Sequence, residues 1–147
     1  MSSREDQVKA AIAHIILPPG ISIRPWTEAD FPAIQRLSAA EGWPTPNERS
    51  DDALTSWRNA WPALVSTGGE TVIGFVRALS DGAVTMYVAE LLVDPAYRGK
   101  GLGRALLDAC HHLHPTVRFD LLSTASSEPF YEANGFRRFQ GFRKSYR

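Results

Sequence analysis

The chain has 147 residues, which is the size of one domain with a single hydrophobic core. Apolar residues make up 44% and charged residues 22%, a composition that excludes wholesale disorder and a fibrous repeat. Sixteen basic residues balance sixteen acidic ones, which argues against a generally basic nucleic-acid binder or a polybasic membrane protein.

Residues 1–20 are expected to form an N-terminal arm, and residues 21–147 the domain proper. The arm is polar at first and then helix-compatible, and Pro18, Pro19 and Gly20 separate it from the domain. Its apolar run lacks a small-residue cleavage site, so it does not resemble a signal peptide. No apolar run approaches the roughly 18 residues of a membrane-spanning helix. We therefore expect a cytoplasmic protein.

The first part of the domain is predicted to contain one strand, two helices and a loop between them. Apolar–polar alternation favours the strand, and a capping threonine before an apolar stripe favours the first helix. The predicted elements are a strand at 21–25, a helix from 27 to 42 with Phe31, Ile34 and Leu37 on its apolar face, a loop at 42–46, and a helix from Ser50 to Pro62.

The second part is predicted to begin with an antiparallel meander, because two glycine-containing turn signals separate three strand-like runs. The predicted elements are strands at 63–66, 71–80 and 84–93, an amphipathic helix at 102–114, a strand at 117–122, a short helix at 129–134, and a last pair of strands at 136–139 and 141–146. Cys110, the single cysteine, falls on the apolar face of the long helix, which excludes an internal disulfide. The fold class is α/β, with a mixed, mostly antiparallel central sheet flanked by helices.

The stretch 91–104 carries the strongest chemical signal, a strand that ends in a glycine-rich turn before a helix. Gly99, Gly101 and Gly103 let the backbone approach a ligand closely and direct successive amides outward. A helix N-terminus has unpaired amides and a partial positive charge, so it attracts phosphate. The turn therefore predicts a polyphosphate ligand.

The distribution of charge supports this prediction. Residues 1–97 contain seven basic and twelve acidic residues, a net charge of −5. Residues 98–147 contain nine basic and four acidic residues, a net charge of +5. Arg98, Lys100 and Arg104 surround the turn. The spacing excludes a Walker A loop, and Arg104 stands where the dinucleotide fingerprint needs its third glycine. A glycine-rich connector with a solvated basic rim is the alternative.

Two motifs resemble signatures of the GNAT superfamily of N-acetyltransferases. The run R-x-x-G-x-G at 98–103, preceded by V-D-P at 93–95, resembles its acyl-CoA pyrophosphate loop. The run F-Y-E-A-N-G-F at 130–136 resembles its second signature. The predicted order of elements matches that fold as well, so the resemblance covers about 125 of the 147 residues.

The resemblance implies that acetyl-CoA is the co-substrate and that backbone amides of the turn bind its pyrophosphate. These amides would come from Gly99, Lys100, Gly101, Leu102, Gly103 and Arg104. Arg98 would fix the turn, and the backbone of Val93 would pair with the pantetheine arm. The Leu91 amide would polarise the thioester carbonyl and stabilise its developing negative charge. Thr124 departs from the pattern, because many members have a cofactor-contacting asparagine there.

Two side chains are the catalytic candidates that the resemblance implies. Tyr131 matches the tyrosine that protonates the departing thiolate, and a phenol with a pKa near 10 stays protonated at neutral pH. Glu90 is the candidate general base, because it lies in an apolar strand beside the expected reaction centre. Pairing of Glu90 with Arg77 is an equally weighted alternative, and an ordered water is another candidate base.

The acceptor pocket of this fold is expected between the first two helices and the last strands. Trp43, Trp57 and Phe142 are the substrate-binding candidates, with simple packing as the alternative for each. Nearby acidic residues would favour a cationic amine, and solvated helix faces are the alternative for them. The acidic residues are Glu28, Glu41, Glu48, Asp51 and Asp52. The expected acceptor is a primary amine of a small molecule or peptide, attacked directly in a ternary complex.

Other readings are an acyl-CoA-binding sensor without catalysis and a nucleic-acid binder that uses the basic C-terminal segment. The second lacks an RNA-binding motif, so no nucleic-acid partner is expected. The histidines at 111, 112 and 114 do not have the spacing of a metal site, and no metal is expected. A homodimer is expected from the family resemblance.

Overall fold

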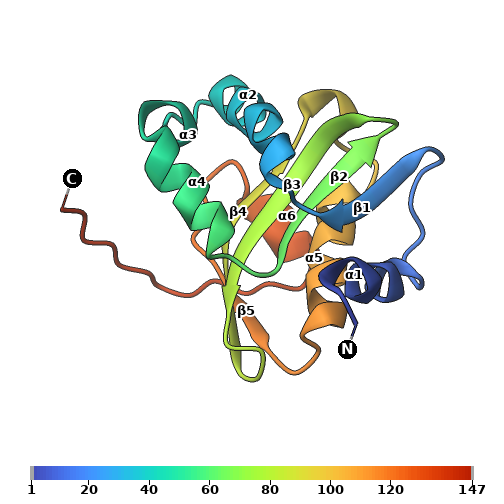
Figure 1. Cartoon of the computed structure of the whole chain (residues 1–147). Coiled ribbons are helices and arrows are strands. Elements are labelled where there is room, and N and C mark those ends of the chain that lie inside the picture. Colours follow the sequence, from blue (N-terminus) through green and yellow to red (C-terminus); the bar gives the residue numbers. More distant parts are fainter. Residues whose placement is uncertain (1, 147) are drawn as a thin grey trace.

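The computed structural model describes residues 2–146 and contains a five-stranded sheet with helices on both faces (Figure 1). Strands β1 to β4 pair antiparallel in chain order, and β5 pairs parallel with β4. The elements are α1 (Arg4–Ile12), β1 (Ile21–Pro25), η1 (Glu28–Asp30), α2 (Phe31–Glu41), α3 (Thr45–Glu48), α4 (Ser50–Arg58), β2 (Ala63–Gly68), β3 (Thr71–Ser80), β4 (Thr85–Val93), η2 (Pro95–Tyr97), α5 (Leu102–Leu113), β5 (Arg118–Asp120) and α6 (Glu128–Ala133). The predicted mixed, mostly antiparallel sheet is confirmed.

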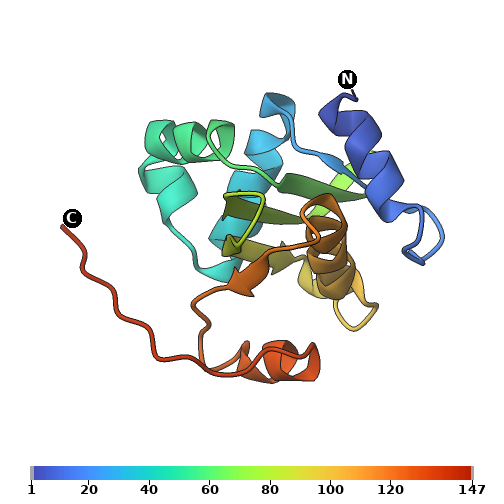
Figure 2. The ribbon, with the colours of Figure 1, turned by 90° about the horizontal axis from the view of Figure 1, so that it is seen from below.

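Two hydrophobic cores, one on each face of the sheet, hold the helices in place. On one face, Val8 of α1 and Leu106 of α5 pack with Met86 of β4. On the other face, Ile34 of α2 packs with Phe75 of β3 and the buried side of α4. Both views place α3 and α4 on one side of the strands and α1 and α5 on the other (Figure 1, Figure 2).

Strand β4 changes face halfway along its length because of a β-bulge. Arg77 pairs with Glu90, whereas the next residue of β3 pairs with Val88, so Ala89 has no partner residue on β3. Val88 therefore belongs to the core that contains α5, and Leu92 to the core that contains α2 and α4. Because side chains alternate along a strand, Glu90 lies on the same face as Leu92.

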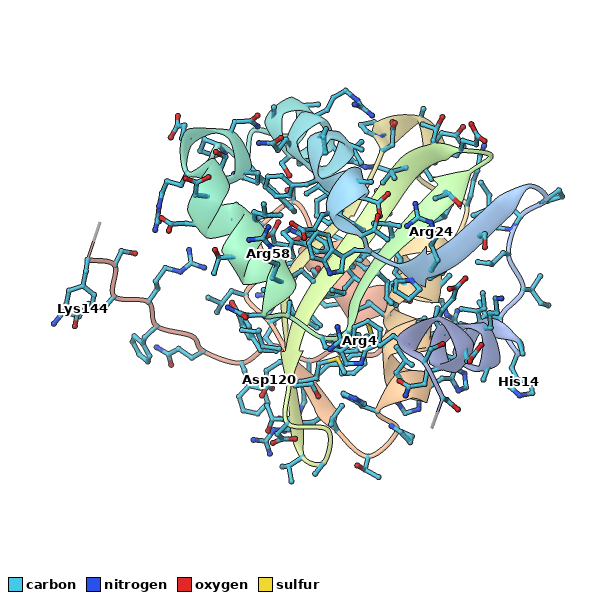
Figure 3. All side chains as sticks on the ribbon, in the orientation of Figure 1. Arg4, His14, Arg24, Arg58, Asp120 and Lys144 are labelled. Carbon is cyan, nitrogen blue, oxygen red and sulfur yellow. The ribbon has the colours of Figure 1, made fainter. Side chains whose placement is uncertain are left out.

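The N-terminal segment packs on the domain through α1. Its helix begins after Ser3, whose hydroxyl accepts a hydrogen bond from the Asp6 amide at 3.1 Å. Val8 is 1% exposed and Ala11 is also buried, and Arg4 lies over the ring of Trp61 at 4.2 Å (Figure 3). The helix thus forms in the part predicted to be a polar arm, because two apolar residues three positions apart suffice to anchor it to α5 and β1.

Val8→Ala is expected to lower the free energy of unfolding by about 1–2 kcal/mol, because it removes buried methyl groups. Lys9→Ala on the exposed face of the same helix is the matched control and is expected to change it by less than about 0.5 kcal/mol. Urea denaturation of both variants measures the difference. Equal small effects would mean that α1 does not support the domain.

The loop predicted at 42–46 is shorter than expected, because α3 begins at Thr45. Proline usually interrupts a helix, but Pro46 stands in the first turn of α3, where its missing N–H has no intrahelical partner to lose. Gly42 ends α2 in the left-handed conformation at φ 83°, as predicted for a helix terminator.

The predicted last pair of strands at 136–139 and 141–146 is wrong. Residues 135–146 contain no helix or strand, and the C-terminal tail extends away from the body of the molecule (Figure 1). Phe139 is 75% and Phe142 86% exposed, so alternation of apolar residues buries no face here. Instead the aromatic rings contact neighbouring cations, as where Arg137 lies 4.4 Å over the Phe139 ring. Lys144 projects from the same tail (Figure 3).

No helix within residues 2–146 has the length and apolar character that crossing a membrane requires.

Candidate functional site

The glycine-rich turn between β4 and α5 has the geometry of an anion-binding site. Gly99 and Gly101 have φ angles of 78° and 82°, a left-handed conformation that favours glycine. No side chain caps the N-terminus of α5, so the first-turn amides of Leu102, Gly103 and Arg104 have no capping acceptor. These amides and the helix dipole fit a phosphate or pyrophosphate group.

The three cations around the turn have partners within the chain. Arg98 donates from Nε to the Val93 carbonyl at 3.0 Å and forms an ion pair with Glu41 at the end of α2. This geometry fits the predicted turn-fixing role of Arg98. Lys100 lies 5.3 Å from the Tyr97 ring centroid, and Arg104 lies 3.7 Å from Asp108 one helical turn on. Both side chains sit at the exposed rim of the turn.

Gly103 brings the two sequence motifs into contact. A β-carbon at Gly103 would lie 3.0 Å from Cζ of Phe130, so the first turn of α5 packs directly on α6. The position therefore favours glycine, because a larger residue would have to shift the Phe130 ring. Tyr131, the next residue on α6, is thereby held near the turn.

The free edge of β4 lies between these two helices. The Asp94 amide donates to the Ile73 carbonyl, so the alternation of an antiparallel pair directs the Leu91 and Val93 amides away from β3. On that side β5 ends at Asp120, opposite Tyr87, and gives these two amides no strand partner. The edge therefore offers amides to an extended ligand in the way an added β-strand would.

Tyr131, the predicted proton donor, lies on this side of the sheet. Its ring is half-buried, with T-shaped contacts to Phe130 at 5.1 Å and Phe136 at 5.4 Å. It packs on the same core as Leu91. Burial raises the pKa of the Tyr131 phenol, which keeps the hydroxyl protonated at neutral pH. None of the hydrogen bonds among residues 2–146 occupies that hydroxyl.

Glu90 lies on the opposite face of β4, where it pairs with Arg77. The Arg77 guanidinium lies 2.7 Å from Oε1 of Glu90, and the two side chains are only 16% and 20% exposed. The alternative that the sequence left open is thus the observed geometry. Oε2 of Glu90 takes no part in this pair.

Glu90 lines a cavity of about 520 Å³ between β4, the start of α3 and α4. The residues that line it are Gly42, Trp43, Pro44, Thr45, Pro46, Arg49, Asp52, Ala53, Ser56, Arg77, Ala89, Glu90 and Arg143. Trp43 is where the sequence predicted it. The bulged residue Ala89 opens the strand at the floor of this cavity.

Two of the predicted substrate-binding residues lie outside the lining of this cavity. Trp57 is fully buried between Trp26 and Phe75, at ring distances of 5.4 and 5.5 Å, because the face of α4 that carries it turns toward the sheet. Phe142 points into solvent from the tail, and its neighbour Arg143 lines the cavity instead. No sequence signal marked Arg143, because that segment was predicted to be a strand.

Of the five acidic residues expected around the acceptor, Asp52 lines this cavity. The cavity carries three arginines and two carboxylates, a net charge of +1. Arg49 and Arg77 were missed as cavity residues, although the pairing of β3 with β4 could have indicated Arg77. Glu28 and Glu41, counted as acidic acceptor residues, pair with Arg58 and Arg98.

Thr124 closes the turn that leads into α6. Its hydroxyl lies 3.1 Å from that of Ser126 and 3.2 Å from that of Ser127. The Ser127 hydroxyl in turn accepts from the Thr124 amide at 3.1 Å. These contacts give Thr124 a role in starting the helix that carries Tyr131.

The histidines near the end of α5 make contacts with other side chains. His114 Nδ1 lies 2.8 Å from the Ser80 hydroxyl, and His111 and His112 contact each other at 5.8 Å. Within the described part of the chain, no group of three potential ligands is placed to hold a metal ion.

Comparison with known proteins agrees with this geometry. The family model of the acetyltransferase (GNAT) domain matches residues 60–138. A GNAT-family acetyltransferase of Streptococcus pneumoniae TIGR4 superposes with a TM-score of 0.68 at 23% identity, over 86% of this chain and 97% of that one. A PaiA N-acetyltransferase of Thermoplasma acidophilum, solved in complex with coenzyme A, superposes with a TM-score of 0.63 at 18% identity, over 80% and 89%.

Curated relatives match shorter segments. Histone acetyltransferase TAP1 of Glycine max is 34% identical over 90 residues, which are 55% of this chain and 39% of that protein. Glucosamine 6-phosphate N-acetyltransferase of Trypanosoma brucei brucei is 39% identical over 59 residues, 38% of this chain and 40% of that protein. The chain thus spans about two fifths of the length of these relatives. Because the family model matches more than half of its length, the chain belongs to the GNAT acetyltransferase family.

Proposed function

We propose that this protein is an acetyl-CoA-dependent N-acetyltransferase that acts on a primary amine of a small molecule or peptide. The observation that carries the proposal is the free edge of β4. It joins the anion-binding turn at one end to the Glu90 cavity at the other, with Tyr131 beside it. The left-handed glycines, the uncapped helix and the unpaired strand amides all fit the acyl-CoA that the family implies.

Three groups of the chain each assist one part of the acetyl transfer. The Leu91 amide donates to the thioester oxygen, where negative charge develops as the amine nitrogen bonds to the carbonyl carbon. The Tyr131 hydroxyl gives its proton to the sulfur as the carbon–sulfur bond breaks. The amine proton passes to Oε2 of Glu90, directly or through a water in the cavity.

The burial of Cys110 supports direct attack by the amine in this proposal. The thiol is completely buried on α5, and burial raises its pKa to about 12, so it supplies no thiolate at neutral pH. Transfer therefore proceeds in a ternary complex, without an acyl-cysteine.

The relatives leave two classes of acceptor open. One relative is named for histones and another for glucosamine 6-phosphate. The first assay should therefore include both peptide amines and small amines. Release of CoA thiol from acetyl-CoA, measured against amines, amino acids, amino sugars and peptides, tests the proposal. Tight CoA binding without release on any acceptor would favour the acyl-CoA sensor instead. The homodimer and the cytoplasmic location stay predictions.

Glu90→Gln is expected to lower kcat about 100-fold, because the amide keeps the size of the side chain but cannot take a proton. Steady-state thiol release measures the change. Glu48→Gln, at an exposed residue of α3 outside the cavity, is the control and should leave kcat unchanged. An unchanged kcat in Glu90→Gln would assign the base role to ordered water.

A further inference from the structure

The cavity beside Glu90 has more positive than negative groups, although its substrate is an amine. Two of its three arginines are neutralised within the chain. Arg77 lies 2.7 Å from Glu90, and Arg49 lies 3.0 Å from Asp52. Charge pairs of this kind cancel in the net charge of the cavity, although each member can still contact a ligand group of opposite sign.

Arg143 is different. It lines the same cavity from the C-terminal tail, and within residues 2–146 the ion pairs of the two cavity carboxylates are with Arg49 and Arg77, not with Arg143. Its neighbours on the tail, Phe142 and Lys144, supply no negative charge either. The guanidinium is therefore the group that gives the cavity its net charge of +1, and it presents several donors to an anion.

We propose that the acceptor carries an anionic group, a carboxylate or a phosphate monoester, in addition to its amine, and that Arg143 binds it. This inference rests on the proposed function. With the amine beside Glu90 on the floor, the anion lies at the rim formed by Arg143, and one cavity of about 520 Å³ holds both. Trp43 and Pro44 supply apolar lining to the same cavity.

The charges also disfavour the alternative class of acceptor. A lysine-rich peptide would bring further positive charge to a cavity whose net charge is already +1. An anionic amine meets opposite charge at both ends, because its ammonium faces Glu90 and its anion faces Arg143. Bidentate recognition of a carboxylate or phosphate is the contact for which arginine is best suited.

Matched pairs of acceptors test the inference with the full chain loaded with CoA. One pair is β-alanine and its amide, and the other is glucosamine 6-phosphate and glucosamine. Isothermal titration calorimetry gives Kd for each, and thiol release from acetyl-CoA gives kcat/KM. In at least one pair, we expect the member that bears the anion to bind about tenfold more tightly than its partner, whose corresponding group is neutral. The pair with the larger ratio identifies carboxylate or phosphate as the anion.

Arg143→Ala should remove that preference and leave the neutral partner within about twofold, and Arg143→Lys should restore part of it. Arg137→Ala is the matched control, because Arg137 lies on the same tail against Phe139 and outside the cavity. Equal binding of the charged and neutral members, or no binding of either anionic amine, would overturn the inference. Absence of thiol release with every amine would instead contradict the proposed function, and the Kd ratios would still decide the role of Arg143.

Discussion

Gly101→Glu is expected to weaken acetyl-CoA binding about 100-fold, the largest effect on affinity that a single substitution should have in this protein. Gly101 is the residue before α5, and a side chain there would stand at the uncapped end of the helix. A carboxylate would occupy the field of the helix dipole and repel the pyrophosphate. Isothermal titration calorimetry with acetyl-CoA measures the change, which corresponds to about 2.7 kcal/mol.

Two further variants separate charge from backbone strain. Gly101 has a φ of 82°, so any side chain adds strain, but no atom lies within 4 Å of an added β-carbon. Gly101→Ala therefore reports the strain alone and should weaken binding only several-fold. Gly82→Glu is the matched control, since Gly82 has a φ of 76°, lies before β4 at the opposite end of that strand from the turn, and has no atom closer than 3.9 Å to an added β-carbon. Tight binding by Gly101→Glu would show that the turn does not hold the cofactor.

Gly103 is a poorer site for the same test, although both glycines belong to the motif. A β-carbon there would meet the Phe130 ring at 3.0 Å, so any substitution displaces α6 as well as the phosphate. Loss of binding in Gly103→Glu would therefore not distinguish a shift of α6 from repulsion of the phosphate. Glycine is thus favoured at Gly101 by its left-handed backbone and at Gly103 by the contact with Phe130.

Where the sequence carried periodicity or turn chemistry, the fold could be predicted closely. The strand predicted at 71–80 has those bounds in the structure, and the long helix begins at Leu102 as expected. Both elements have a strong apolar pattern and a glycine-containing turn beside them. The tail at 136–146 has a similar alternating pattern but forms no strand. Alternation stabilises a strand only where the strand pairs with a neighbour and packs its apolar side chains against a core.

The candidate site also has a part that the sequence could predict and a part that it could not. The turn and Tyr131 lie in continuous motifs, so the sequence could place them, and Gly103 brings them together. The cavity is built from α3, α4, β4 and the tail, and long-range packing decides which side chains face it. Helical spacing put Trp57 on an apolar face, but it could not distinguish a core from a pocket.

Tyr131→Phe is expected to lower kcat by about 100-fold or more, while the Kd for acetyl-CoA changes less than about twofold. Phenylalanine keeps the T-shaped contacts with Phe130 and Phe136, so the packing of α6 and the stability of the domain are preserved. What is lost is the proton for the departing sulfur. Steady-state thiol release and calorimetry together measure the two parameters.

The pH dependence provides an independent check on this role. Burial raises the pKa of Tyr131 above its usual value near 10, so the donor stays protonated through neutral and mildly alkaline pH. The kcat of the wild type should therefore not fall as the pH rises to about 10. If deprotonation of Tyr131 causes a fall at higher pH, that fall should be absent in Tyr131→Phe. Tyr146→Phe, at an 86% exposed tyrosine of the tail, is the control for the loss of a phenol. A kcat that is equal in Tyr131→Phe and the wild type would remove Tyr131 from the mechanism and leave solvent to protonate the sulfur.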